Sequence, residues 1–329
     1  MDDLSRQLLL FLQNGIPLQK RPFEGIAAKL GLDSADVLLR ISRLKLKKTV
    51  RQITALLDGR SLGYDNTLAA MIVPPEKMER AVFWMKAHPG VTQCSARENE
   101  FNLWFTLAVP AGILEQQIRR LHTLAGAKKT ILLPALKNFK SAVPGEPAGF
   151  TGETKSAALS ALEKALLRRI QEDFPLDDEP FQKLGADCGI PESEILVLLK
   201  AWTRKGYLKK ITALMPSRPA GSRTGVAVVW EVPEERQDEA GARIAAFNEV
   251  ADCVKRPAYP EFPYALHARV RVHGLEDAGV ILGKISSAVG SWPYRLLWQA
   301  KEVKKIRLKY FSENLDNWES RAGVNVIKE

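Results

Sequence analysis

The apolar and polar positions of this chain follow two periods, one helical and one alternating, and the period changes along the sequence. In the first 58 residues, three stretches have apolar side chains at helical spacing, and the first two end at Gly15 and Gly31. Asp33 or Ser34 is placed to cap the third. The helices are expected at residues 6–14, 23–30 and 34–48. An alternating run follows at residues 49–58, so the pattern predicts a winged helix-turn-helix.

The next 80 residues or so change to short alternating runs separated by amphipathic segments. Strands are expected at residues 67–73, 91–97, 101–109 and 129–133. Helices are expected at residues 75–87 and 111–124. This order, βαββαβ, is typical of a ferredoxin-like domain.

The whole pattern occurs twice. Pro22, Gly31 and Thr54 match Pro180, Gly189 and Thr212 at one constant offset, and later blocks align Arg97 with Arg256. A Pro- and Gly-rich stretch separates the copies, as in linkers. The predicted fold class is therefore α+β, a tandem duplication of a winged helix-turn-helix plus a ferredoxin-like βαββαβ domain. The expected boundaries are 1–58 and 59–140 for the first copy, 141–158 for the linker, and 159–216 and 217–329 for the second copy.

Composition narrows the class of protein. No apolar run approaches the roughly 18 residues of a membrane span, and three scattered cysteines argue against a disulfide framework or a structural zinc site. We therefore expect a cytoplasmic protein with no membrane association. The net charge of +10, concentrated in residues 1–150, favours an anionic partner, with solubility as the alternative explanation.

The sequence has no phosphate-binding loop, no dinucleotide fingerprint and no metal-ligand spacing among its histidines. We therefore expect no cofactor and no protein-bound metal. The third helix of the first copy is basic from Arg40 to Arg51, without an acid. It is either a DNA-recognition helix or a solvated basic face. The matching helix of the second copy carries Glu192 and Glu194, which counts against a duplicated DNA reader.

Unusual side chains gather in the ferredoxin-like parts. Arg97, Asn99, Asn102 and Trp104 surround one strand turn of the first copy. A longer hairpin of the second copy contains Arg256, Tyr259, Tyr264, His267, Arg269, Arg271 and His273. The last four share one face of a strand, because side chains repeat every two residues. Such a row is either solvent-facing or lines a site for a multiply charged anion, which guanidinium groups bind bidentately.

A winged helix followed by βαββαβ resembles the AsnC/Lrp regulators, and the motifs resemble the siroheme decarboxylases more closely. The first half carries LGY at residues 62–64 and NLWF at residues 102–105, similar to one subunit of that family. The second half carries WEVP, KRPAYPEFPYALHARVRVHG and KKIRLKYFSE, similar to the other subunit. The resemblance covers nearly the whole chain and implies the two subunits fused into one internal pseudo-dimer, with further homo-oligomers open.

The resemblance implies siroheme, or a related tetrapyrrole, as the substrate, decarboxylated at two acetate side chains. A substrate with eight carboxylates fits Arg97 and Arg256 as carboxylate ligands and His267 or His273 as proton donors. The expected catalytic residues are these two histidines and Arg97. The expected substrate ligands are Arg97, Asn99, Asn102, Trp104, Arg256, Tyr259, Tyr264 and Arg269. The alternative function is an AsnC/Lrp-like DNA-binding regulator that responds to a tetrapyrrole or an amino acid.

The sequence also departs from the family. Asn99 and Gln93 stand where the family usually has histidines, and Asn99 cannot relay a proton. The second half reads PYALH where PYNLF is usual, which introduces His267. The LGY element has no counterpart near residues 217–225. These departures leave open which half reacts, or whether this is a diverged paralogue.

Overall fold

A computed structural model describes residues 2–141, 158–215, 224–272 and 274–326. Residues 142–157 of the predicted linker lie outside the described residues. So do residues 217–223, where a second LGY element is missing from the sequence. The chain forms two compact units. One comprises Met1–Tyr64, Thr154–Arg218 and Lys309–Glu313, and the other comprises Asp65–Glu153, Pro219–Leu308 and Asn314–Glu329. Like parts of the two copies therefore associate with each other.

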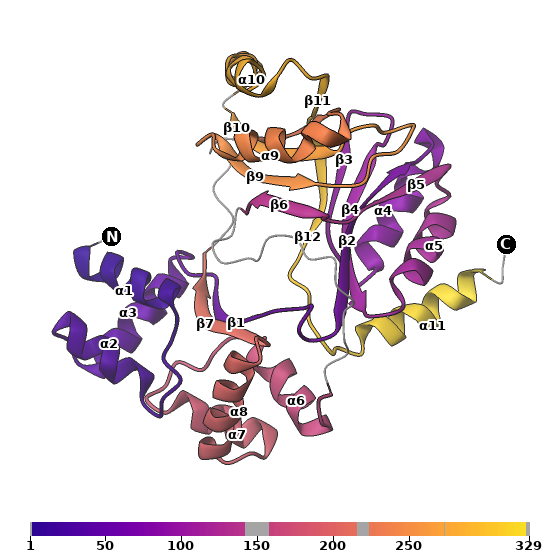
Figure 1. Ribbon diagram of the computed structural model, residues 1–329. Helices are drawn as coiled ribbons and strands as arrows, with labels where there is room; N and C mark the ends of the chain where they lie inside the picture. The colour runs from indigo at the N-terminus through magenta and orange to yellow at the C-terminus, as the bar shows by residue number, and fades with distance from the viewer. Residues whose placement is uncertain (1, 142–157, 216–223, 273, 327–329) are drawn as a thin grey trace. The chain divides into compact units, whose positions relative to one another are not determined.

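The first unit contains both helix-turn-helix parts (Figure 1). Its elements are α1 (Asp3–Asn14), α2 (Pro22–Leu30), α3 (Ser34–Leu46), β1 (Gln52–Leu57), α6 (Ala161–Ile170), α7 (Pro180–Cys188), α8 (Glu192–Arg204) and β7 (Leu208–Leu214). The side chain of Asp33 accepts a hydrogen bond from the Asp36 amide and caps α3, as expected. Gly31 ends α2 with a left-handed backbone, which a residue with a Cβ adopts less readily.

The strand predicted after the three helices is present in each copy, but its partner lies in the other copy. β1 pairs antiparallel with β7, with Thr54 opposite Thr212. Both threonines are buried. The Thr54 hydroxyl donates to the carbonyls of Ile170 and Gln171, and the Thr212 hydroxyl donates to that of Leu12. A two-stranded ribbon formed by both copies therefore replaces the hairpin of a separate wing.

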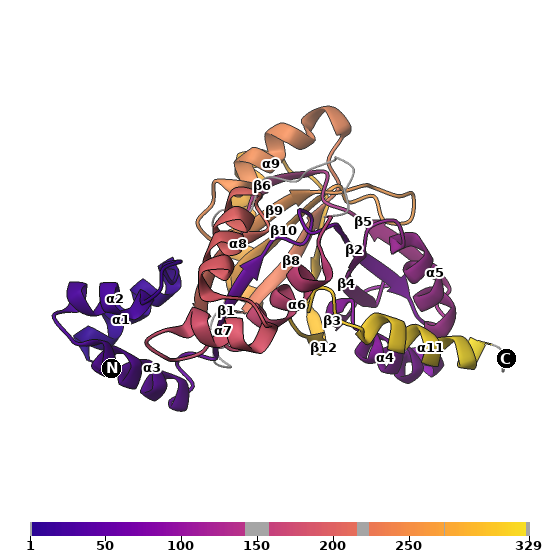
Figure 2. The same ribbon diagram turned by 90° about the horizontal axis from the view of Figure 1, so that it is seen from below.

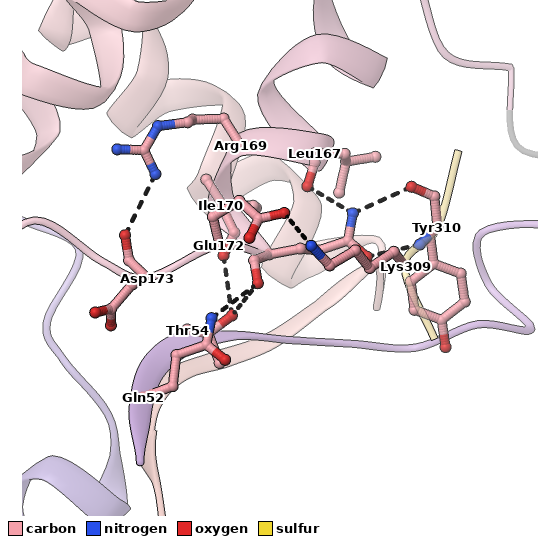
Figure 3. A network of polar contacts seen from close by, with 10 residues as sticks. Gln52, Thr54, Leu167, Arg169, Ile170, Glu172, Asp173, Lys309 and Tyr310 are labelled. Atoms are coloured by element: carbon pink, nitrogen blue, oxygen red, sulfur yellow. Dashed lines mark hydrogen bonds and ion pairs between the residues drawn. The ribbon is translucent and has the colours of Figure 1, made fainter. Parts of the chain in front are cut away.

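A short segment near the carboxyl end, residues 309–313, completes this unit (Figure 3). The buried side chain of Gln171 accepts from the Tyr310 amide at 2.7 Å and donates to the Tyr310 carbonyl at 3.2 Å. The Phe311 amide donates to the Tyr64 hydroxyl, and the Tyr64 ring packs edge-on against Tyr310 and Phe311. The tyrosine of the LGY motif thus holds this segment against the helix-turn-helix pair.

The second unit contains both ferredoxin-like parts. The first copy supplies β2 (Tyr64–Ile72), η1 (Pro75–Lys77), α4 (Met78–Ala87), β3 (Val91–Arg97), β4 (Leu103–Pro110), α5 (Leu114–Ala125), β5 (Lys129–Leu133) and β6 (Lys137–Lys140). The second copy supplies β8 (Thr224–Trp230), η2 (Glu234–Arg236), α9 (Gln237–Ala245), β9 (Val250–Lys255), β10 (Leu266–Val272), α10 (Leu275–Val289), β11 (Tyr294–Leu297), β12 (Gln299–Lys305) and α11 (Asn314–Val326). The predicted fold class is confirmed, and β3 and β5 have the expected bounds.

The two copies exchange their last strands. One sheet has the order β12-β3-β4-β2-β5, and the other has the order β11-β8-β10-β9-β6. β6 of the first copy therefore lies beside β9 of the second, and β12 of the second copy lies beside β3 of the first (Figure 1). This exchange was not predicted, because a strand pattern does not name the strand with which it pairs.

Each sheet has one face covered by helices of the unit and one face turned toward the other sheet. Ala69, Met71 and Phe105 pack with α4 and α5 on the helical side, while Ala70 and Trp104 point to the other side. In the second copy, Val228 and Trp230 pack on the helical side and Val229 points to the opposite sheet. This alternation follows the two-residue period of strands. It creates an apolar layer between the sheets.

The carboxyl-terminal helix α11 lies next to the helices α4 and α5 (Figures 1 and 2). Trp318 and Ala322 are buried in the same core as Trp84 and Leu121. In the described part of the chain, no helix combines the length and apolar character needed to cross a membrane.

Candidate functional site

The layer between the sheets contains a cluster of aromatic side chains from both copies. Phe262 is central, with ring centroids 5.6 Å from Phe101, 5.6 Å from Trp104 and 5.0 Å from Tyr264. All four are at least nine-tenths buried. The Trp104 indole donates to the Phe101 carbonyl at 2.6 Å, so its polar atom is satisfied inside the layer.

One arginine from each copy enters this layer. The Arg97 Nη1 donates to the carbonyl of Leu297 at 2.5 Å, and the Arg256 Nη1 donates to the carbonyl of Leu133. These leucines are the last residues of β11 and β5, where the chain crosses to the other sheet. Each guanidinium therefore holds a crossover of the opposite copy. The Arg97 guanidinium also lies 5.5 Å from the Trp104 ring centre.

The two guanidinium groups lack anionic partners. The Nε atoms of Arg97 and Arg256 are buried without a hydrogen-bond partner, and neither side chain forms an ion pair within the described residues. Burial lowers the pKa of each to about 10, which leaves both charged at neutral pH. Charges buried in this way are costly unless an anion compensates them.

His267 lies at the edge of the same aromatic cluster. Its ring centre is 5.8 Å from that of Phe262 and 6.3 Å from that of Trp104. Its Nε2 is 3.0 Å from the Tyr264 carbonyl oxygen. Burial, together with the charges of Arg256 and Arg97, lowers the His267 pKa to about 3. With this pKa, His267 carries no proton to donate at pH 7 in this state, and its predicted role as a proton donor stays a prediction.

The side chains predicted to share one face of β10 begin with His267 in this buried layer and continue toward solvent with Arg269. Leu266, Ala268 and Val270 face the helical core, so His267 and Arg269 face the other way. Arg269 is paired with Asp252 through both Nε and Nη2, and about half of its side chain is exposed. Its charge is therefore already compensated. His273 lies outside the described residues, and its predicted role stays a prediction.

The remaining predicted ligands make local contacts. The Asn99 Oδ1 accepts from the Phe101 amide at 3.1 Å, and the Asn102 side chain bonds both the amide and the carbonyl of Val73. The chain bends at residues 98–101, and β4 begins at Leu103 rather than at residue 101. The Tyr259 hydroxyl donates to the Leu132 carbonyl at 2.6 Å. Asn99, Asn102 and Tyr259 therefore position the chain around the site.

The structure thus brings Arg97, Trp104, Arg256, Tyr264 and His267 together and places Arg269 one row away. Sequence reasoning missed Phe101 and Phe262, which complete the aromatic layer, and Asp252, which neutralises Arg269. Phe262 had a signal, since it lies between the two prolines of the PEFPY run. The role of Asp252 had none, because it depends on its pairing opposite Arg269.

Two protein-family models match the chain. The siroheme decarboxylase NirDL-like helix-turn-helix domain matches residues 5–51 and 163–208. The AsnC-like ligand-binding domain matches residues 61–140 and 220–304. Each matches once in each half, as expected for a duplicated chain.

Individual proteins resemble the chain over its length. A siroheme decarboxylase of Hydrogenobacter thermophilus is 34% identical over 95% of this chain and 96% of its own. The crystal structure of the siroheme decarboxylase NirDL in complex with an iron-uroporphyrin III analogue is 31% identical, with a TM-score of 0.83 over 98% of this chain and all of that one. A siroheme decarboxylase alpha subunit of Desulfovibrio desulfuricans is 41% identical over 43% of this chain and 81% of the subunit.

Proposed function

Since the chain belongs to the siroheme decarboxylases, we propose that it is a carboxy-lyase that converts siroheme to 12,18-didecarboxysiroheme in an alternative route to haem. It releases two molecules of CO2 from the acetate side chains at C12 and C18. The iron is part of the substrate, and the proposal needs no cofactor of the chain's own.

The observation that carries this proposal is the pair of uncompensated guanidinium groups of Arg97 and Arg256 in an apolar layer. A polycarboxylate ring supplies the negative charge that they lack, and guanidinium groups bind carboxylates with paired hydrogen bonds. The flat aromatic surfaces of Trp104 and Tyr264 suit a planar macrocycle. The two arginines come from different copies, so the proposed site needs both copies of the duplicated unit.

The proposed reaction is balanced without a redox partner. The bond between the side-chain carbon and the carboxylate breaks, CO2 leaves, and the electron pair passes to the protonated pyrrole. A proton then adds to the side-chain carbon, which becomes a methyl group, and the ring releases the proton that it had taken up. One proton is consumed for each CO2 released. A carboxylate held out of water loses CO2 more easily, and the buried arginines provide such a position. Asn99 does not supply the proton, because an amide is not an acid at neutral pH.

The test is anaerobic incubation of the full chain with siroheme, followed by mass spectrometry. The expected result is loss of two CO2 from the ring, with Arg256→Gln reducing turnover at least tenfold, as expected for a lost charge-assisted hydrogen bond. The exposed Arg295, whose guanidinium lies over the Tyr264 ring, provides the control variant Arg295→Gln. It should retain turnover. Unchanged siroheme with the wild-type chain would contradict the proposal.

The DNA-binding alternative is less well supported by the contacts of α3. Arg40 is paired with Asp2, and Lys45 is paired with Asp173 of the second copy. These pairs reduce the charge that the helix offers to phosphates. Salt-sensitive binding to one specific duplex, together with unchanged siroheme, would favour a regulator.

A further inference from the structure

The centre of the layer between the sheets has a local symmetry that the strand pairing makes explicit. On β3, Ser95 lies opposite Trp104. On β9, Val254 lies opposite His267. Arg97 follows Ser95 by two positions, and Arg256 follows Val254 by two positions. The two arginines are therefore equivalent, while Trp104 of one copy occupies the position that His267 occupies in the other.

His267 shares its surroundings with both cations. Arg256 lies two positions after Val254, the residue opposite His267, and so is on the same face of the sheet. The Arg97 guanidinium lies 5.5 Å from the Trp104 ring centre, and that centre is 6.3 Å from the His267 ring. Both positive charges disfavour a protonated His267. One Nη of each is held by a carbonyl of the opposite copy, while the Nε has no partner. The two arginines are thus fixed in place, with donors still available.

Other charged groups lie farther out in the described residues around this centre. The ion pair of Asp252 and Arg269 lies on the neighbouring row of β9 and β10, where Asp252 acts on Arg256. Arg295 is the cationic residue of β11. It is exposed, and its guanidinium lies over the Tyr264 ring. The loop beside His267 also contains the phenols of Tyr259 and Tyr264 and the carboxylate of Glu261, which is exposed and paired with Lys129. None of these places a carboxylate between the two central arginines.

The tautomer of His267 follows from its hydrogen bond. The Tyr264 carbonyl oxygen only accepts, so the hydrogen lies on Nε2. Nδ1 is then the nitrogen that takes up a further proton. An anion placed between the arginines would cancel their repulsion of an imidazolium and favour that uptake.

We propose that a single carboxylate binds between Arg97 and Arg256, shared by both, and that its arrival lets His267 take up a proton from solvent on Nδ1. That the carboxylate is a side chain of siroheme rests on the function proposed above. In that reaction, the imidazolium returns its proton to the side-chain carbon after CO2 has left, and His267 becomes neutral again. Substrate binding would therefore create the acid that the free site lacks.

The first test uses the unaltered chain and formate as the smallest carboxylate. The imidazole signals of ¹⁵N-histidine-labelled protein are followed by NMR as pH is varied, with and without formate. His267→Gln identifies the signal. We expect formate to raise the pKa of His267 from about 3 into the neutral range, and the signal of His122, on α5 and bonded to Thr130, to be unaffected as an internal control. No response of His267 to formate would overturn the proposal.

The second test asks whether the two arginines share one carboxylate. Siroheme binding is measured by absorbance titration for Arg97→Gln, Arg256→Gln and the double variant, after each is checked for native unfolding behaviour. Each single change should weaken binding about tenfold or more. A shared carboxylate predicts that the double variant loses much less than the product of the two effects, because neighbouring groups on one ligand are coupled.

Effects that multiply would show separate carboxylates and overturn the proposal. A failure of the proposed function is distinguishable from both results. If the wild-type chain neither binds nor converts siroheme, yet formate still shifts His267, the anion site stands and the siroheme assignment fails. If siroheme is converted but formate has no effect on His267, the proposed function stands and the shared carboxylate site fails.

Discussion

At the scale of single residues, His88 is a buried titratable group away from the proposed site. It is fully buried at the end of α4, where the Gly90 amide donates to Nδ1 at 2.9 Å and Nε2 lies 3.2 Å from the Gln117 side-chain oxygen. Its ring centre lies 4.2 Å from that of Trp318. Burial, with smaller effects of Lys304 and Arg120, lowers the His88 pKa to about 4. The core therefore favours the neutral imidazole of His88.

This predicts that acid destabilises the fold through His88. The unfolded chain binds the proton near pH 6.5 and the folded chain only near pH 4, so the free energy of unfolding falls as the pH is lowered between these values. The full effect is about 3 kcal/mol. His88→Asn should lower the free energy of unfolding at pH 7. It should also make that free energy depend less steeply on pH, and the dependence that remains is the one due to His267. Urea unfolding between pH 4 and pH 7 measures this. His122→Asn is the control, and an equal loss of slope in both variants would contradict the prediction.

At the scale of elements, α11 serves as a cover for the helical side of the first copy. Trp318 is 5% exposed, its ring lies edge-on to Trp84, and the Arg120 guanidinium lies 5.5 Å from its centre. Lys304 of β12 donates to the carbonyls of Met85 and His88 at the end of α4, and the His88 carbonyl also accepts from the Val91 amide. The last two elements of the second copy therefore complete the first.

Trp318→Ala should consequently cost about 3–5 kcal/mol of unfolding free energy, the usual effect of removing a buried aromatic side chain. Phe83 is the matched control, because it lies on α4 next to Trp84 but is 61% exposed. Phe83→Ala should change stability by no more than about 0.5 kcal/mol. Denaturant unfolding of the two variants provides the comparison. If Trp318→Ala lowers the free energy of unfolding no more than Phe83→Ala does, α11 contributes little to the core.

At the scale of the whole molecule, the reciprocal strand exchange makes each copy depend on the other. The first-copy sheet contains β12, and the second-copy sheet contains β6. A sheet without its last strand exposes an unpaired edge, which favours aggregation. The pairing of β1 with β7 adds the same dependence in the other unit.

We therefore expect residues 1–150 and 151–329, expressed as two chains, to be insoluble apart and to form a stable complex when expressed together. The Desulfovibrio desulfuricans relative, a separate alpha subunit, is consistent with such a division. Co-purification through a tag on one half, followed by size-exclusion chromatography, tests this. Two halves that remain soluble and monomeric on their own would contradict it.

The sequence by itself determined the local elements, the duplication and the types of side chain near the site. Helical period, glycine stops and the Asp33 cap act over a few residues, so they are legible in the chain. Arg97, Trp104 and Arg256 were recognisable because cations beside aromatic runs are unusual in strands. Tertiary structure alone decided which strands pair across the copies, that Asp252 neutralises Arg269, that Asn102 binds Val73, and that His267 is buried and neutral. These outcomes depend on register and burial between segments far apart in sequence, where no local pattern carries the information.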